Sequence, residues 1–176
     1  VLSASRAVAP WVVEGGILAP RRLRVYGALC RPYSSAHEVE LAHEQIRSLG
    51  DAYDLDLRGL RDALRSDESY RQFSHIEYPV GPATLLYDIE LGSDEEPPES
   101  MYAILTANEA GPISGAMVWF EADYDDNLVM SNLPGTPNHW GQLVLCWSHE
   151  RGVRAGEEVR VQVTVEDEEL DIQYLP

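Results

Sequence analysis

The chain has 176 residues and a mass of 19.7 kDa, and 44% of its residues are hydrophobic, which suits one domain with its own core. Its formal net charge of −17 repels nucleic acid and anionic membrane but is compatible with a basic partner. No apolar run approaches the ~20 residues of a membrane span. No signal-peptide pattern opens the chain, so we expect a cytoplasmic protein.

The first part of the chain predicts a short helix followed by an extended segment. Residues 1–13 have helical spacing with Pro10 inside, and the glycine pair at 15–16 stands where a helix C-cap is expected. Residues 22–31 then predict an extended segment, with Leu23 among its inward-facing residues.

Residues 33–75 are predicted to form a helical arm. Ser35 followed three residues later by Glu38 matches a capping box, and this helix is expected to end at Gly50. The apolar residues on one of its faces are Val39, Ala42, Ile46 and Leu49. A second short helix after Asp56 carries three leucines in register: Leu57, Leu60 and Leu64.

From about residue 74 onward the apolar period changes to two, which predicts antiparallel strands. The strand segments are TLLYDIEL, MYAILT, ISGAMVWFEAD, NLVMS, QLVLCW, EEVRVQVTVE and LDIQYL. Turn residues separate them, and residues 92–100 are expected to form an acidic surface loop. The pattern predicts a mainly β fold, an antiparallel β-barrel or sandwich that carries the helical arm.

The cysteines and histidines show no metal-binding pattern. Cys30 and Cys146 are far apart and lack Cys/His ligand spacing, which predicts two buried thiols rather than a disulfide framework or a zinc site. His37 and His43 are six residues apart on a predicted helix and so lie on different faces. No nucleotide-binding or nucleophile motif occurs, so we expect neither a metal nor a cofactor on this chain.

The stretch DYDDN at 123–127 begins like a calcium-binding loop. Asp123, Asp125 and Asn127 match the first three ligand positions. Leu128 then stands where the loop needs glycine, and Pro134 where it needs glutamate, so we expect a hairpin turn instead.

Four segments resemble segments of the protein arginine methyltransferases, and they occur in the family's order. WVVEGGILAP resembles the exit from the family's domain that binds S-adenosyl-L-methionine (SAM), with Gly16 and Pro20 in the family's places. YDLDLRGLRDAL resembles part of the dimerisation arm, and RAGEEVRVQVTV a late turn and strand of the barrel. SNLPGTPNHWGQLVL resembles the loop with the family's Thr-His-Trp motif, with Asn138 in place of the threonine.

The resemblance implies a division of the chain. Residues 1–20 correspond to the end of a SAM-binding domain, and residues 21–176 to the family's C-terminal β-barrel with an inserted dimerisation arm at 33–75. A homodimer would form through the apolar residues of the arm: Leu57, Leu60 and Leu64. The family's glycine-rich SAM loop and paired glutamates have no counterpart here, so this chain alone is expected neither to bind SAM nor to transfer a methyl group.

The resemblance also assigns the candidate site. In the family the barrel closes one side of the arginine-binding cleft, and a loop histidine reaches toward the catalytic domain. His139 matches this histidine as a pocket-organising and substrate-binding residue, and Trp140 matches its neighbour. The complete enzyme would use SAM as its cofactor and an arginine-containing protein or peptide as its substrate.

Two other functions stay open. One is a non-catalytic β-barrel module that dimerises or binds a basic partner, and the other is a methyltransferase for a small molecule. A histidine and a tryptophan at a strand entry are, on general grounds, more often a satisfied polar group and a core anchor than a site. Upstream sequence with a glycine-rich loop and paired glutamates would favour a methyltransferase.

Overall fold

The computed structural model describes residues 2–31, 44–60, 70–74, 79–93, 97–136, 140–166 and 169–175. The helical residues are α1 (Leu2–Val8), the 3₁₀ turn η1 (Ala9–Trp11), 44–53 and 58–60. The strands are β1 (Arg22–Cys30), β2 (Tyr70–Ser74), β3 (Thr84–Glu90), β4 (Ser100–Thr106), β5 (Gly111–Asp123), β6 (Val129–Ser131), β7 (Gln142–Val153), β8 (Glu158–Glu166) and β9 (Glu169–Tyr174).

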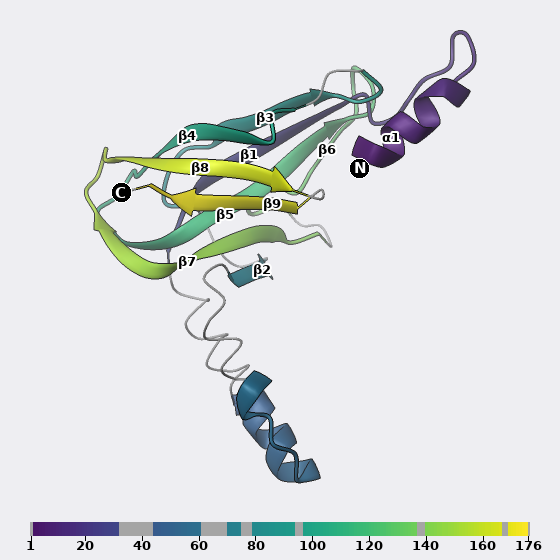
Figure 1. Ribbon diagram of the computed structural model, residues 1–176. Helices are drawn as coiled ribbons and strands as arrows, with labels where there is room; N and C mark the ends of the chain where they lie inside the picture. The colour runs from purple at the N-terminus through teal and green to yellow at the C-terminus, as the bar shows by residue number, and fades with distance from the viewer. Residues whose placement is uncertain are drawn as a thin grey trace.

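The strands form two antiparallel sheets (Figure 1). The larger has the order β2-β7-β5-β1-β3, with β6 paired to the end of β5, and the smaller has the order β4-β8-β9. Every strand predicted from period-two alternation is present, so the mainly β, antiparallel fold is confirmed. The hairpin predicted at DYDDN joins β5 to β6, and both cysteines are buried as predicted.

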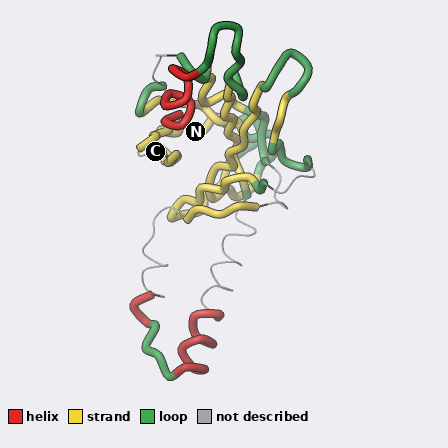
Figure 2. Tube along the Cα trace, turned by 90° about the vertical axis from the view of Figure 1, so that its right-hand side faces the viewer, coloured by secondary structure: helices red, strands yellow, loops and turns green. Residues whose placement is uncertain are grey.

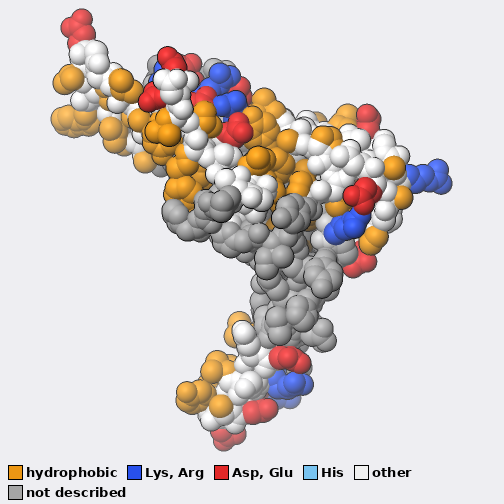
Figure 3. Space-filling model, turned by 180° about the vertical axis from the view of Figure 1, so that it is seen from behind, with side chains coloured by type: hydrophobic (Ala, Val, Ile, Leu, Met, Phe, Trp, Pro, Cys, Tyr) orange, Lys and Arg blue, Asp and Glu red, His pale blue; other side chains and the backbone are white. Residues whose placement is uncertain are grey.

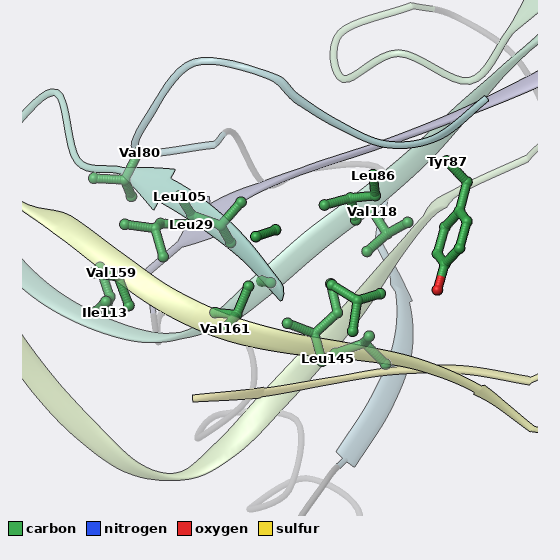
Figure 4. Close-up of a cluster of buried hydrophobic side chains, with 14 of the residues drawn as sticks. Leu29, Val80, Leu86, Tyr87, Leu105, Ile113, Val118, Leu145, Val159 and Val161 are labelled. Atoms are coloured by element: carbon green, nitrogen blue, oxygen red, sulfur yellow. The ribbon is translucent and has the colours of Figure 1, made fainter. Parts of the chain in front are cut away.

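The hydrophobic core lies between the two sheets (Figure 4). Its fully buried side chains come from both sheets and include Leu29, Leu105, Ile113, Leu145, Val159, Val161 and Val163. In β8 the buried valines alternate with more exposed residues, because successive side chains of a strand point to opposite faces. The sequence therefore predicts which face of β8 packs inward.

The two sheets are not joined into a closed barrel over the described residues, which differs from the predicted barrel. Where β3 approaches β4, the hydroxyl of Thr84 donates to the carbonyl of Ile104 at 3.3 Å. Where β7 approaches β9, Nε1 of Trp147 donates to the carbonyl of Ile172 at 2.9 Å. Side chains rather than backbone ladders bridge both seams. Apolar alternation in the sequence cannot distinguish a closed barrel from two packed sheets, because both arrangements bury the same residues.

The predicted helical arm at 33–75 is helical at 44–53 and 58–60, and it ends earlier than predicted. Residues 70–74 are strand β2 and pair with β7 from Tyr70↔Cys146 to Ser74↔Gln142. This pairing satisfies backbone groups of β7 that an edge strand leaves open, a long-range effect that overrides the local period. Figure 2 shows these two helical pieces and the loop between them apart from the strands.

Candidate functional site

The candidate site is the loop that connects β6 to β7 and begins with a tight turn. The amide of Thr136 donates to the carbonyl of Leu133 at 3.0 Å, and Gly135 has a φ of 83°. Proline at the second position and a glycine with positive φ at the third define a type II β-turn. The sequence LPGT therefore reverses the chain just before the predicted site.

Trp140 lies near the other end of this loop, at the entry to β7. Its side chain is 40% exposed, and its ring centroid lies 6.3 Å from that of Phe120 on β5. One side of the indole thus contacts the sheet while another part remains accessible. Trp140 is both a packing anchor and a surface group, so the two interpretations from the sequence are compatible.

Two buried amide side chains flank the loop, and sequence reasoning missed both. Asn132 follows β6 and Gln142 opens β7, and only 4% and 2% of their surfaces are exposed. Their positions next to a turn and a strand start are common for polar residues, so position alone carries no signal. Burial of a polar residue is the informative feature, and it is visible only in the fold.

A charged lattice covers one end of a face of the larger sheet. Arg22 and Arg24 of β1 face acidic residues on both neighbouring strands, namely Asp88, Glu90, Glu121 and Asp123. Arg22 donates two hydrogen bonds to Asp88, and Arg24 donates one to Asp123. The Arg22 guanidinium holds the pKa of the Asp88 carboxyl below its usual value. Acidic groups outnumber the two arginines, so this face suits a basic ligand better than an acidic one.

Next to this lattice lies a cleft of about 530 Å³. Its lining residues are Arg21, Arg22, Asp88, Glu90 and Asp123. The sequence holds a signal for the lattice that sequence reasoning did not use: RLR, DIE and EAD each place two like charges two residues apart. On strands such pairs share one face.

Tyr26 and Trp119 separate the charged lattice from an apolar part of the same face. They are opposite each other in the β1–β5 pairing, and their rings stack with centroids 6.0 Å apart. The phenol of Tyr26 donates to Oε2 of Glu121 at 3.1 Å. Burial is the larger cause that raises the pKa of Tyr26, and this hydrogen bond is the next.

The site residues predicted from the sequence are only partly described. His139 and Asn138 lie outside the described residues, as does Leu64. Leu57 is half-buried and lies in the non-helical stretch 55–57, so the helix predicted after Asp56 begins later than predicted, and Leu60 is exposed in the helical residues 58–60.

The predicted hairpin at 123–127 is held by its own side chain. The amides of Asn127 and Leu128 donate to Oδ1 of Asp125 at 2.7 and 2.9 Å. This carboxylate oxygen is therefore engaged in an Asx turn. Among the described residues no group of three or more His, Cys, Asp or Glu side chains could hold a metal ion, and no helix could span a membrane.

Solved structures of known proteins are similar to this fold. This chain is similar to protein arginine methyltransferase 10 of Arabidopsis thaliana in an open conformation, with a TM-score of 0.69 and 15% identity. The match covers 98% of this chain and 60% of the methyltransferase chain. The Trypanosoma brucei PRMT1 enzyme–prozyme heterotetrameric complex with AdoHcy gives a TM-score of 0.65 and 11% identity, covering 95% and 55% of the two chains. PRMT6 gives a TM-score of 0.54 and 16% identity, covering 96% and 58%.

The resemblance predicted from the sequence motifs is thus confirmed at the level of the fold. The chain has the fold of arginine methyltransferase chains and spans 55–60% of the length of these three. The sequence matches no protein-family model and no curated protein.

Proposed function

We propose that this chain is the substrate-side domain of a SAM-dependent arginine N-methyltransferase. The observation that carries the proposal is the fold, shared over 98% of the chain with an arginine methyltransferase of which it spans 60%. The motifs around Gly16, Pro20 and His139 occur in the family's order and support the same assignment.

In this proposal a methyltransferase domain outside the 176 residues binds SAM. One of the similar structures contains AdoHcy, the product that SAM leaves after methyl transfer. The segment from the end of α1 to β1 would pack against that domain, because several of its large apolar side chains are exposed. They are Val8, Trp11, Val13 and Ile17, and Figure 3 shows hydrophobic side chains gathered on this projecting segment.

The substrate would be an arginine-containing protein or peptide. The charge of −17 and the acidic excess of the lattice favour a cationic ligand by long-range attraction. His139 would organise the guanidinium pocket from the loop, and Trp140 would support it by its contact with Phe120. Site residues on a loop placed by a rigid scaffold are a common arrangement in enzymes.

The helical arm would form the homodimer. Apolar side chains on its described part are exposed and therefore available to a second subunit: Leu49, Tyr53, Leu55 and Leu60. Leu57, which directly precedes the helical residues 58–60, and Leu64 would belong to the same interface, as their spacing in the sequence predicts.

The test replaces His139 with alanine in the enzyme that carries its methyltransferase domain. Methyl transfer to an arginine peptide is expected to fall, but by less than the ~10²- to 10⁴-fold that removal of a primary acid or base costs. SAM affinity, measured by calorimetry, should stay unchanged because the cofactor binds to the other domain. His149→Ala, in β7, is the matched histidine control and should keep full activity.

Full activity of the His139→Ala enzyme would contradict the assigned site. Absence of any methyl transfer by the unsubstituted enzyme, on peptides and small guanidines alike, would favour a non-catalytic interaction module instead.

A further inference from the structure

The side-chain amides of Asn132 and Gln142 each donate to a backbone carbonyl at the opposite end of the 133–141 loop. Nδ2 of Asn132 donates to the carbonyl of Gly141 at 2.9 Å, and Nε2 of Gln142 donates to the carbonyl of Asn132 at 2.7 Å. Both bonds cross from the strand that enters the loop to the strand that leaves it. The pair therefore closes the base of the loop.

Asn132 can take part because its side chain replaces its own carbonyl in the sheet. The amide of Phe120 on β5 donates to Oδ1 of Asn132 at 2.7 Å, in the position that a ladder carbonyl normally occupies. The amide of Asn132 still donates to the carbonyl of Phe120 at 3.3 Å. The chain leaves the ladder at this point, and the carbonyl of Asn132 is left to accept from Gln142.

Further contacts attach the loop to Phe120 of β5. The hydroxyl of Ser131 donates to the carbonyl of Phe120 at 3.1 Å and accepts from the amide of Leu133 at 3.0 Å. The ring of Phe120 contacts Trp140 near the far end of the loop. Backbone and ring of one β5 residue thus set the position of both loop ends.

Stability of the sheet explains only half of the Gln142 side chain, because its Nε2 satisfies the carbonyl of Asn132. Its Oε1 atom is buried and has no hydrogen-bond partner among the described residues. An unpaired buried acceptor costs free energy, and an apolar side chain of the same shape would avoid that cost. Departures of this kind from local stability are expected at functional sites.

We infer that Asn132 and Gln142 form a clamp whose role is to position the β6–β7 loop for the substrate. They are positioning residues that act through the loop and do not touch the reacting atoms. The inference deepens the proposed function and rests on it for the substrate, but the mechanical part is testable without any activity.

The mechanical test uses Gln142→Met, which keeps the length of the side chain and removes its donor. Hydrogen exchange of the Leu133 and Thr136 amides should become about fivefold faster or more, because one crossing hydrogen bond is lost. The melting temperature should stay within about 3 °C of the parent, because the variant removes the unpaired Oε1 acceptor while it leaves the Asn132 carbonyl without its donor, and these two effects on stability oppose each other. Ser114→Ala is the matched control, since Ser114 is buried in β5 and its hydroxyl has no partner in the part of the chain that the structure describes. It should leave exchange in the loop unchanged.

Unchanged exchange at Leu133 and Thr136 would overturn the clamp. A lower melting temperature with faster exchange throughout the sheet would also overturn it, because Gln142 would then be a structural residue only.

The functional test measures Gln142→Met in the enzyme with its methyltransferase domain. KM for an arginine peptide should rise about fivefold, with kcat within about twofold and SAM affinity unchanged, because an unfastened loop must be ordered at each binding event. An unchanged KM beside a loosened loop would contradict the positioning role. If the parent enzyme transfers no methyl group, the proposed function fails, while the exchange result still decides whether the clamp exists.

Discussion

Tyr26 joins the charged and apolar parts of one sheet face through a single side chain. Its ring stacks on Trp119, and its hydroxyl donates to Glu121 in the lattice. Burial and this hydrogen bond raise its pKa above 10.0, and burial also raises the pKa of Tyr87. The folded state favours both neutral phenols. Their contribution to stability is therefore fully present below pH 10 and is lost as the pH rises through the folded-state pKa values.

A tyrosinate absorbance titration with Tyr26→Phe tests this assignment. The variant should show one late-ionising phenol fewer than the parent, because phenylalanine keeps the stacking and removes the hydroxyl. At neutral pH the variant should lose about 1 kcal/mol of unfolding free energy, the net contribution of one hydrogen bond. Tyr102→Phe, at an exposed position of β4, should change it by less than about 0.5 kcal/mol. If the high-pH part of the titration is the same in Tyr26→Phe as in the parent, Tyr26 is not one of the late-ionising phenols.

The seam between β7 and β9 is held by side-chain contacts, with Trp147 at its centre. Besides donating to Ile172, Trp147 packs its ring 5.7 Å from that of Tyr174. The guanidinium of Arg151 lies 4.7 Å from the centre of the Tyr174 ring and is paired with Glu157 at 2.7 Å. These contacts attach the last strand to the larger sheet at a place where the described residues form no backbone ladder.

Trp147→Phe should therefore destabilise β9 more than the rest of the fold. The loss of the Ile172 hydrogen bond and of part of the ring is expected to cost about 1–3 kcal/mol. Hydrogen exchange should accelerate first in residues 169–174. Thr84→Val makes the matching deletion at the β3–β4 seam and should cost less, because its bond of 3.3 Å is longer. Equal exchange increases in β8 and β9 would argue against a separate seam.

Elements that a local pattern determines were predictable from the sequence, and elements that long-range pairing determines were not. The valines of β8 alternate so regularly that strand and buried face follow from the sequence alone. Strand β2 was missed because its partner β7 lies about seventy residues away in the chain. The lattice and the clamp required a register between strands, so the like-charged pairs and Asn132 had no visible partners in the sequence.

On the scale of the whole molecule, a strong net charge opposes association while two apolar surfaces favour it. Four large apolar residues of α1 and its connection to β1 are 51–82% exposed, and four of the arm are 49–70% exposed. Exposed apolar groups in clusters mark interaction sites. Because the two clusters lie on separate segments (Figure 1), substitutions can be made in one cluster without changing residues of the other.

The 176-residue chain should self-associate, and more strongly as salt is added. Salt shortens the Debye length from ~30 Å at 0.01 M to ~10 Å at 0.1 M, which screens repulsion between chains of charge −17 and leaves apolar contacts in place.

In sedimentation measurements, Leu55→Ser with Leu60→Ser should weaken association about tenfold or more, both in this chain and in the complete enzyme. Trp11→Ser with Ile17→Ser should weaken it only in this chain, because the methyltransferase domain would cover that surface in the complete enzyme. Tyr102→Ser with Ile104→Ser, on the exposed face of β4, is the control and should have no effect. Association that weakens with salt would instead indicate an interface held by ion pairs and would contradict the proposed apolar dimer.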